Sequence, residues 1–426
     1  MSTQSHQRHA SFWAAFGPGL LWAATAIGVS HLVQSTRAGA TAGLGLAGVI
    51  LLALILKYPF FEYGPRYAAA TGMSLVEGYR HIGRWALWLY FFITVTTSIV
   101  VLSAIIMLTG FLLNYAFDLR LPIPLMGGVI LGTCGLMLWV GRFPLLDKAV
   151  KVVLVVLAVS TLVAAVVTIG RVEFSTLGLL PEIGTAEGAV RFAFLLALVG
   201  WMPSAIDISV WSSLWTLAKD KEAGTRTSVA HARLDFFVGY AATGFLAFCF
   251  LALGAGVMFA SGTAFSGAGT VFSTQLVHLY SSTLGEWTRP IVLVAVLTTM
   301  LSTSLAVVDG YPRAIERSIV NLRPGHSDDR SVPTAGTSYW MSLVVLAILT
   351  VLVLWRFAGD LTTMVDFATI VSFLTAPILG YLNLRAVTSP EVAPEDRPSR
   401  GMLVLSWVGL VLLGGTAVMY LVYLVT

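Results

Sequence analysis

Two short stretches interrupt apolar runs in this sequence and decide how the chain folds: GVSH at residues 28–31 and GWMPS at residues 200–204. Each lies within a run long enough to cross a membrane, which takes about 20 mostly apolar residues. Glycine and proline release backbone groups from a helix, and in lipid such groups are costly unless they line a cavity or meet a ligand. We therefore predict two helices broken near mid-membrane. Two kinks without function are the simpler alternative, since both residues are common in membrane helices.

The composition places most of the chain in lipid. Of its 426 residues, 57% are hydrophobic and only 11% are charged, whereas soluble domains carry about 25% charged residues. This excludes a soluble enzyme, a nucleic-acid binder and a disordered scaffold, and it makes the lipid bilayer the first expected partner. Cys134 and Cys249 both lie in apolar runs and are expected to be small buried side chains rather than a disulfide.

Apolar runs of membrane length recur along the whole chain. We predict eleven spans, at roughly 12–34, 41–66, 85–115, 121–141, 146–169, 190–217, 234–260, 290–319, 338–357, 362–384 and 401–425. The longest outer connection, 261–289, is rich in Gly, Ser and Thr and is expected to be a loop. No predicted loop is long enough to hold a soluble catalytic domain.

Lys and Arg are distributed unevenly between the predicted loops. Eighteen fall on the side of the N-terminus and six on the opposite side. Because cytoplasmic loops carry the excess of Lys and Arg, this bias predicts a cytoplasmic N-terminus and an extracytoplasmic C-terminus. We expect an integral protein of a bacterial cytoplasmic membrane.

The two interrupted spans are the first and the sixth, so they occupy corresponding places in two sets of five. This is typical of inverted-repeat transporters, which bind substrate between broken helices. The predicted organisation is a cytoplasmic tail (1–11), a first five-helix repeat (12–170), a second, inverted repeat (190–385) and an added eleventh helix (401–426).

Several motifs resemble the NRAMP family of metal-ion transporters. They are GPGLL at 17–21, the break at 28–31, RAGA at 37–40, MP at 202–203, Asp235, and STS at 302–304. The resemblance covers about residues 14–385 and implies an all-α membrane protein with the LeuT-type fold.

The resemblance also implies a substrate site, which this sequence matches only in part. The family's first break reads Asp-Pro-Gly-Asn, and its Asp and Asn bind the metal; Gly28 and His31 stand at those two positions here. The family's Met-Pro-His is Met202-Pro203-Ser204, so the methionine ligand remains, as does a backbone carbonyl at Val199.

We therefore expect His31 and Met202 to be metal ligands. Imidazole and thioether ligands suit softer ions than the oxygens that Mg²⁺ and Mn²⁺ prefer. A neutral His31 that satisfies a backbone carbonyl is the alternative. Ser30 and Ser204 are expected to contact substrate or to cap freed backbone groups.

Asp207 is the nearest carboxylate that could replace the missing acidic ligand. An ionisable residue within a span is a functional candidate by default, and a structural hydrogen bond to a neighbouring helix is the alternative. Other in-span acids are expected to form ion pairs near the membrane surfaces. The expected pairs are Glu62 with Arg66, Asp235 with Arg233, Asp309 with Arg313 and Asp366 with Arg356.

The sequence thus predicts a secondary transporter of metal ions that works by alternating access, with atypical ion selectivity. A LeuT-type carrier of a small organic solute such as an amino acid is the second reading. An intramembrane enzyme would need a paired catalytic constellation, which the sequence does not show. No nucleotide-binding or cofactor motif is present, so we expect no cofactor and no use of ATP. Coupling to protons stays open, because Gly28 and Ser204 replace two residues that could carry them.

Overall fold

The computed structural model describes residues 17–141, 143–178, 190–323, 335–357 and 359–425, and for 143–154 it describes the backbone alone. The named elements in these ranges are all helices. Eight of them are long and apolar enough to cross a membrane. They are α4 (Ala47–Thr71), α6 (Arg84–Ala116), α7 (Ile123–Val140), α11 (Val229–Val257), α13 (Arg289–Leu322), α14 (Thr337–Arg356), α15 (Leu361–Val387) and α16 (Arg400–Tyr423).

Three further segments run through the bundle. One is α8 (Phe143–Thr168). The other two are interrupted: α2 (Pro18–Ala26) is followed by a π-helical turn, η1 (Ser30–Ser35), and by α3 (Thr36–Ala42), while α9 (Phe192–Gly200) is followed by α10 (Ile208–Ala223). The helix breaks are therefore 27–28 and 201–207. Ser30 and His31 lie just past the first break, at the start of η1, rather than within it.

Two other expectations need correction. The loop predicted at 261–289 contains α12 (Gly269–Leu284), which buries Phe272, Leu276 and Tyr280 on one side, so its apolar residues follow a helical period despite the many Ser and Thr. The first predicted span ends later than expected, at Ala42, because Gly43 turns the chain with φ of 56°, a conformation that favours glycine.

A short helix in the connection between α4 and α6 also went unpredicted. In α5 (Leu75–Ile82), Ser74 and Glu77 form a capping box, which pairs the otherwise free N–H groups at its start. The Ser-x-x-Glu spacing of these two residues is the feature of the sequence that indicates the start of α5.

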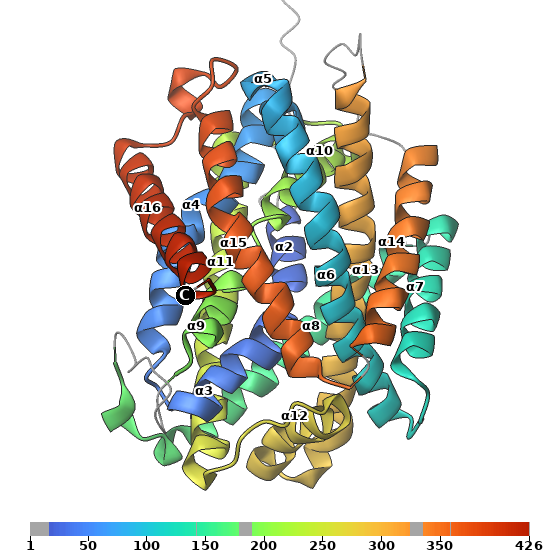
Figure 1. Cartoon of the computed structure of the whole chain (residues 1–426), viewed down its shortest axis with the longest axis vertical. Helices are drawn as coiled ribbons and strands as arrows, with labels where there is room; N and C mark the ends of the chain where they lie inside the picture. The colour runs from blue at the N-terminus through green and yellow to red at the C-terminus, as the bar shows by residue number, and fades with distance from the viewer. Residues whose placement is uncertain (1–16, 142, 179–189, 324–334, 358, 426) are drawn as a thin grey trace, which may run out of the picture.

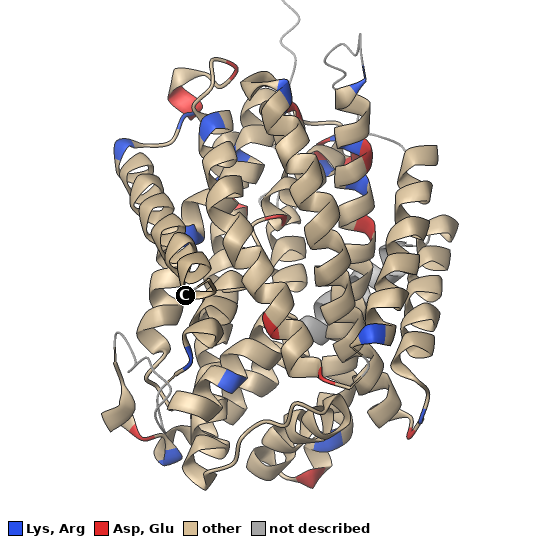
Figure 2. Cartoon of the chain, in the orientation of Figure 1, with Lys and Arg blue, Asp and Glu red and all other residues tan. Residues whose placement is uncertain are grey.

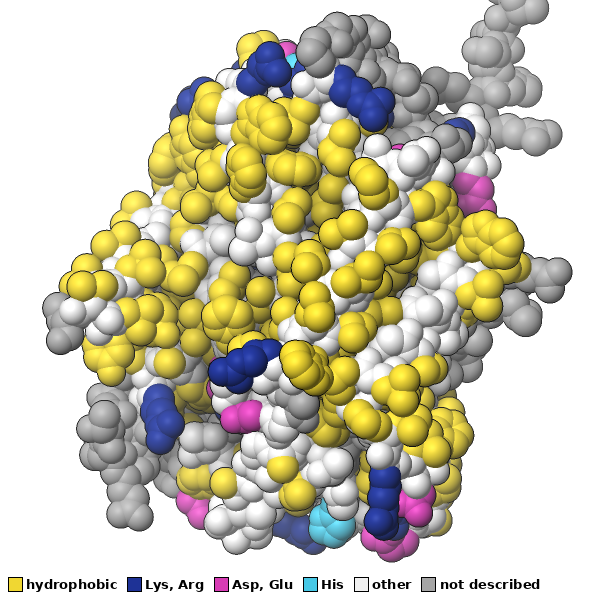
Figure 3. All heavy atoms as spheres, turned by 45° about the vertical axis from the view of Figure 1, so that its right-hand side comes forward, with side chains coloured by type: hydrophobic (Ala, Val, Ile, Leu, Met, Phe, Trp, Pro, Cys, Tyr) yellow, Lys and Arg dark blue, Asp and Glu magenta, His cyan; other side chains and the backbone are white. Residues whose placement is uncertain are grey.

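The interrupted segments lie inside the bundle, and plain helices surround them. Figure 1 shows α16 at one edge and α7 with α14 at the other, while α2 lies in the interior, where it packs against α11. Hydrophobic side chains cover most of the face seen in Figure 3. Lys and Arg are most frequent at the end of the bundle where α5 lies (Figure 2). This arrangement suits a protein that crosses a bilayer.

Candidate functional site

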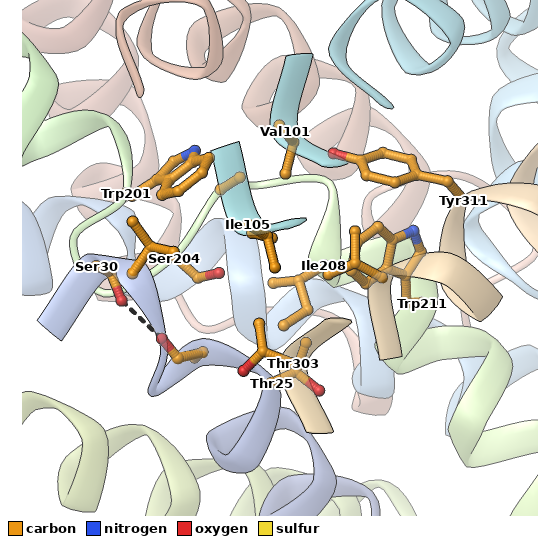
Figure 4. A pocket seen from close by; sticks show the side chains of 14 residues that line it. Thr25, Ser30, Val101, Ile105, Trp201, Ser204, Ile208, Trp211, Thr303 and Tyr311 are labelled. Carbon is orange, nitrogen blue, oxygen red and sulfur yellow. Dashed lines mark hydrogen bonds between the residues drawn. The ribbon is translucent and has the colours of Figure 1, made fainter. Parts of the chain in front are cut away.

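The two helix breaks face each other across a single cavity. It is lined by Ala26, Val29 and Ser30, which flank the first break, and by Trp201, Ser204 and Ala205, which lie in the second (Figure 4). Its volume is about 40 Å³, and one buried water needs roughly 10–15 Å³ on the same measure. In this conformation the cavity therefore has room for a few waters or a small ion, and it is too small for an amino acid.

The remaining walls come from three helices. Val101 and Ile105 belong to α6, Ile208 and Trp211 to α10, and Thr303, Val307 and Tyr311 to α13. The Trp211 ring of α10 packs directly on the backbone of Gly310 in α13, since a Cβ built on Gly310 would lie 2.7 Å from that ring.

The polar groups in the cavity are hydroxyls and the indoles of Trp201 and Trp211, and none of the described residues that line it is charged. The hydroxyls of Thr25 and Ser30 donate to carbonyls one helical turn back, those of Leu21 and Ala26. Three other lining groups have no hydrogen-bond partner among the described residues: Thr303 Oγ1, Trp211 Nε1 and Tyr311 OH. Buried polar groups are normally paired, so the two hydroxyls are free to contact a bound ion, a solute or water, and the Trp211 indole, which can only donate, is free to contact a solute or water.

His31 lies outside this cavity. It is fully buried, its Nε2 lies 3.0 Å from the Thr243 carbonyl of α11, and its Nδ1 lies 2.7 Å from Ser30 Oγ. A carbonyl can only accept, so Nε2 carries a hydrogen and donates it. In a neutral His31 the Nδ1 can then only accept, so it shares the one Ser30 hydroxyl hydrogen with the Ala26 carbonyl. Both ring nitrogens have a partner, as in the alternative interpretation of this residue, and His31 contacts Ser30 at the cavity wall.

Of the other expected site residues, some border the cavity and some do not. Ser204 lines it. Gly28 is not among the lining residues, although a Cβ built on it would meet the lining residue Thr303 at 3.0 Å. Met202 is fully buried and is not among the lining residues. The structure therefore does not bring His31 and Met202 together around one space, and the described residues contain no cluster of three or more His, Cys, Asp or Glu suited to a metal.

Asp207 ends the second break and points to α6. Its Oδ1 accepts a hydrogen bond of 3.1 Å from Thr97, whereas its Oδ2 has no partner among the described residues. The residue is buried but does not line the cavity. It is thus a buried carboxylate beside the site with one free oxygen.

The Val199 carbonyl, expected to contact a metal, has a hydrogen-bond partner that the sequence did not indicate. This carbonyl accepts a hydrogen bond from Lys57 of α4, and so do the carbonyls of Gly200 and Ser204. The sequence places Lys57 inside a span without giving it a role. The sequence could have indicated a role for Lys57, because a Lys within a membrane helix is costly, and such charged residues are rare and usually functional.

Ion pairs and caps hold the ends of the bundle near the site. The expected ion pairs Glu62–Arg66 and Asp309–Arg313 are both confirmed, and Glu62 also pairs with Arg233. Two others are wrong. The Asp235 carboxylate accepts the Gly19 N–H at 2.6 Å, at the start of α2, and Asp366 pairs with Arg37 instead of Arg356. Both true partners are distant in sequence, so proximity along the chain could not identify them.

Comparison with known proteins gives a consistent result. A family model described as "Natural resistance-associated macrophage protein-like" (Nramp) matches residues 19–423. An uncharacterized protein of Pasteurella multocida (strain Pm70) is 32% identical over 415 residues, which are 97% of this chain and 93% of that protein.

Solved structures share the fold at low sequence identity. The manganese transporter of Eremococcus coleocola, in complex with an aromatic bis-isothiourea substituted compound, has a TM-score of 0.72 at 15% identity, covering 98% of this chain and 88% of that one. MhsT in complex with L-phenylalanine has a TM-score of 0.63 at 12% identity, covering 98% and 99%. At such identities the likeness concerns the fold alone.

Proposed function

Because this chain belongs to the Nramp family and is therefore a membrane transporter rather than an enzyme, we propose that it moves a metal ion by alternating access, driven by ion gradients. The family transports divalent metal ions, and the proposed difference lies in ion selectivity. The observation that carries the proposal is the cavity between the two helix breaks, where neutral hydroxyls lie among apolar side chains and none of the described lining residues is charged.

The proposed architecture is that of the LeuT-type transporters. With the eight long apolar helices, α8 and the two interrupted segments would make up the eleven spans of this proposal. We propose that 12–170 and 190–385 are inverted repeats and that 401–426 is an added helix, with the tail 1–11 in the cytoplasm. The end of the bundle at α5, rich in Lys and Arg, would then be cytoplasmic.

The proposed substrate site uses oxygen ligands. Ser30 and Ser204 offer hydroxyls from the two breaks, and Thr303 offers a hydroxyl without another partner. Neutral oxygens bind a divalent ion less strongly than a carboxylate, because they lack its charge. We therefore expect an ion that keeps part of its water shell, as Mg²⁺ usually does in proteins, and weaker Mn²⁺ binding than in a relative with Asp at position 28.

The proposed oxygen-lined site does not use His31, Met202 or Asp207 directly. His31 and Met202 become ligands only if the breaks rearrange during the cycle, since neither lines the cavity. The free oxygen of Asp207, at the end of the second break, is a negative group that could balance an incoming cation. Coupling to protons is tested by the same uptake experiment, which is run with and without a pH gradient.

Uptake into liposomes tests the proposal. Purified protein is reconstituted and screened for uptake of Mn²⁺, Zn²⁺, Mg²⁺ and a panel of amino acids, with and without a pH gradient. We expect uptake of at least one metal ion, and a several-fold loss of it in Ser30→Ala and Ser204→Ala. Ser282→Ala is the matched control, because Ser282 lies exposed on α12 and bonds only to the Leu279 carbonyl.

The outcomes separate the candidate functions. Uptake of an amino acid without uptake of any metal would reject the metal proposal in favour of an organic solute. If His31→Ala loses transport while Ser30→Ala and Ser204→Ala keep it, the oxygen-lined site is wrong and His31 is the ligand.

A further inference from the structure

Lys57 lies deep in the bundle without an acidic partner. Only 1% of its surface is exposed. Its Nζ donates hydrogen bonds to the carbonyls of Val199 at 3.0 Å, Gly200 at 2.9 Å and Ser204 at 2.8 Å. None of the ion pairs found in the described part of the chain includes it. Its charge is therefore balanced by backbone dipoles and not by an acidic side chain among the described residues.

The geometry fits the charged form of the side chain. An ammonium has three N–H donors and no acceptor, and each donor here has one carbonyl. A neutral amine has only two hydrogens and would leave one of the three carbonyls without a bond. The ring of Phe61, with its centroid 5.5 Å from Nζ, adds a cation–π contact.

The three carbonyls form a site suited to a cation. Val199 and Gly200 close the C-terminal end of α9, and Ser204 lies in the break that follows. The last carbonyls of a helix have no partner within it and carry its partial negative charge. In inverted-repeat transporters, unwound carbonyls and half-helix C-terminal ends coordinate Na⁺ or H⁺.

We propose that Lys57 is a built-in cation that fills this carbonyl site, so that neither an alkali ion nor the transported metal uses these three oxygens. For the metal, this inference rests on the proposed function. Val199 supplies the carbonyl that the family resemblance implied as a metal contact, and that oxygen is already taken. Ser204 joins the two sites, since its carbonyl accepts from Lys57 and the residue also lines the cavity.

Two consequences follow from the ammonium at this place. Its positive charge repels a divalent ion in the neighbouring cavity, which makes Lys57 a determinant of ion selectivity. It also holds the broken helix together without a free ion, so folding and transport need neither Na⁺ nor K⁺.

The test compares Lys57→Gln and Lys57→Met with the unmodified protein. Lys57→Gln keeps two N–H donors without the charge, and Lys57→Met keeps an unbranched side chain, one atom shorter, without donors. Lys221→Met is the control, because it removes the same charge from an exposed position in α10. Thermal unfolding is measured in NaCl, KCl and N-methylglucamine chloride at equal ionic strength, and Mn²⁺ and Mg²⁺ binding by calorimetry.

We expect the melting temperature of Lys57→Met to rise by several degrees when Na⁺ or K⁺ replaces N-methylglucamine, because an ion that binds only the folded state stabilises it. The unmodified protein and Lys221→Met should show no such rise. Both Lys57 variants should bind Mn²⁺ at least about tenfold more tightly, since a nearby like charge is gone.

Three results would overturn the inference. One is an alkali-ion dependence in the unmodified protein equal to that of the variants. The second is folded variants with neither alkali dependence nor tighter Mn²⁺ binding. The third is failure of both variants to fold even in concentrated NaCl and KCl. The proposed function has a separate failure, because absence of metal uptake by the unmodified protein would leave the alkali-ion result intact.

Discussion

The guanidinium of Arg37 lies 2.7 Å from the carboxylate of Asp366 and joins α3 to α15 at the end of the bundle opposite α5 (Figure 1). The contact is bidentate, and Gln34 donates a further hydrogen bond to the same carboxylate. Since α3 continues the broken first segment, this ion pair fixes the part of that segment beyond the cavity. It is the contact that would have to break for α3 to move away from α15.

The Arg37–Asp366 pair should contribute measurably to stability. A double-mutant cycle with Arg37→Ala and Asp366→Ala should give a coupling free energy of about 1 kcal/mol, since bidentate and half-buried pairs exceed typical exposed ones. Lys219 and Glu222 form a more exposed pair at 3.5 Å, and the same cycle there should give a value near zero. Equal coupling free energies in the two cycles would show that the Arg37–Asp366 pair does not hold α3 in place.

Close backbone contact between α2 and α11 should make Gly239 intolerant of a side chain. A Cβ built on Gly239 would lie 2.3 Å from the Gly19 carbonyl oxygen, which is backbone and cannot swing aside. Gly239→Ala should lower the free energy of unfolding by about 1–3 kcal/mol, the usual cost of overpacking. Gly132→Ala on α7 has nothing within 4 Å, so thermal unfolding should show no loss for this control.

An acid at position 28 should restore metal affinity only if space is made for it. Gly28→Asp would place its Cβ 3.0 Å from Thr303 Oγ1, so the single substitution is crowded. Gly28→Asp combined with Thr303→Ala should raise Mn²⁺ affinity at least about tenfold over Thr303→Ala alone, because a carboxylate adds Coulomb attraction in the cavity. Calorimetry decides this, and tight Mn²⁺ binding by the unmodified protein would contradict its premise.

Asp360 should give acid-dependent stability at the start of α15. Burial is the largest single influence and raises the pKa of its carboxyl, but the hydrogen bonds from Thr363 and Thr362, together with the charge of Arg37, outweigh it and hold the pKa below its usual range. A carboxyl whose pKa is lower when folded stabilises the fold above the unfolded value of about 3.9, and this stability is lost as pH falls through the folded pKa. The side chain is exposed, so the effect should not exceed about 1 kcal/mol.

The substitution Asp360→Asn isolates that effect. Asparagine caps a helix about as well as aspartate but does not titrate, so the variant should lose less stability between about pH 5 and pH 2. An identical acid profile for both proteins in thermal unfolding would mean that the Asp360 charge contributes nothing.

Much of the fold could be predicted from the sequence because lipid imposes strict rules on it. The apolar runs fixed the helices of the bundle to within a few residues at most ends, as at α6 and α13. The Gly and Pro residues near 28 and at 200–203 located both breaks, and the family resemblance is confirmed. What periodicity missed were helices outside the spans, such as α5 and α12, whose mixed composition resembles that of a loop.

By itself, the sequence determined that this protein is a helical membrane transporter with two broken segments, since composition, span length and helix-breaking residues are local properties. Only the tertiary structure decided what the broken segments contact. His31 meets Thr243, 212 positions away, and Lys57 meets Val199, 142 positions away. Those partners depend on how each helix is rotated and where it crosses its neighbours. An all-apolar helix carries little information about its rotation, so a buried polar residue finds its partner only when the bundle is packed.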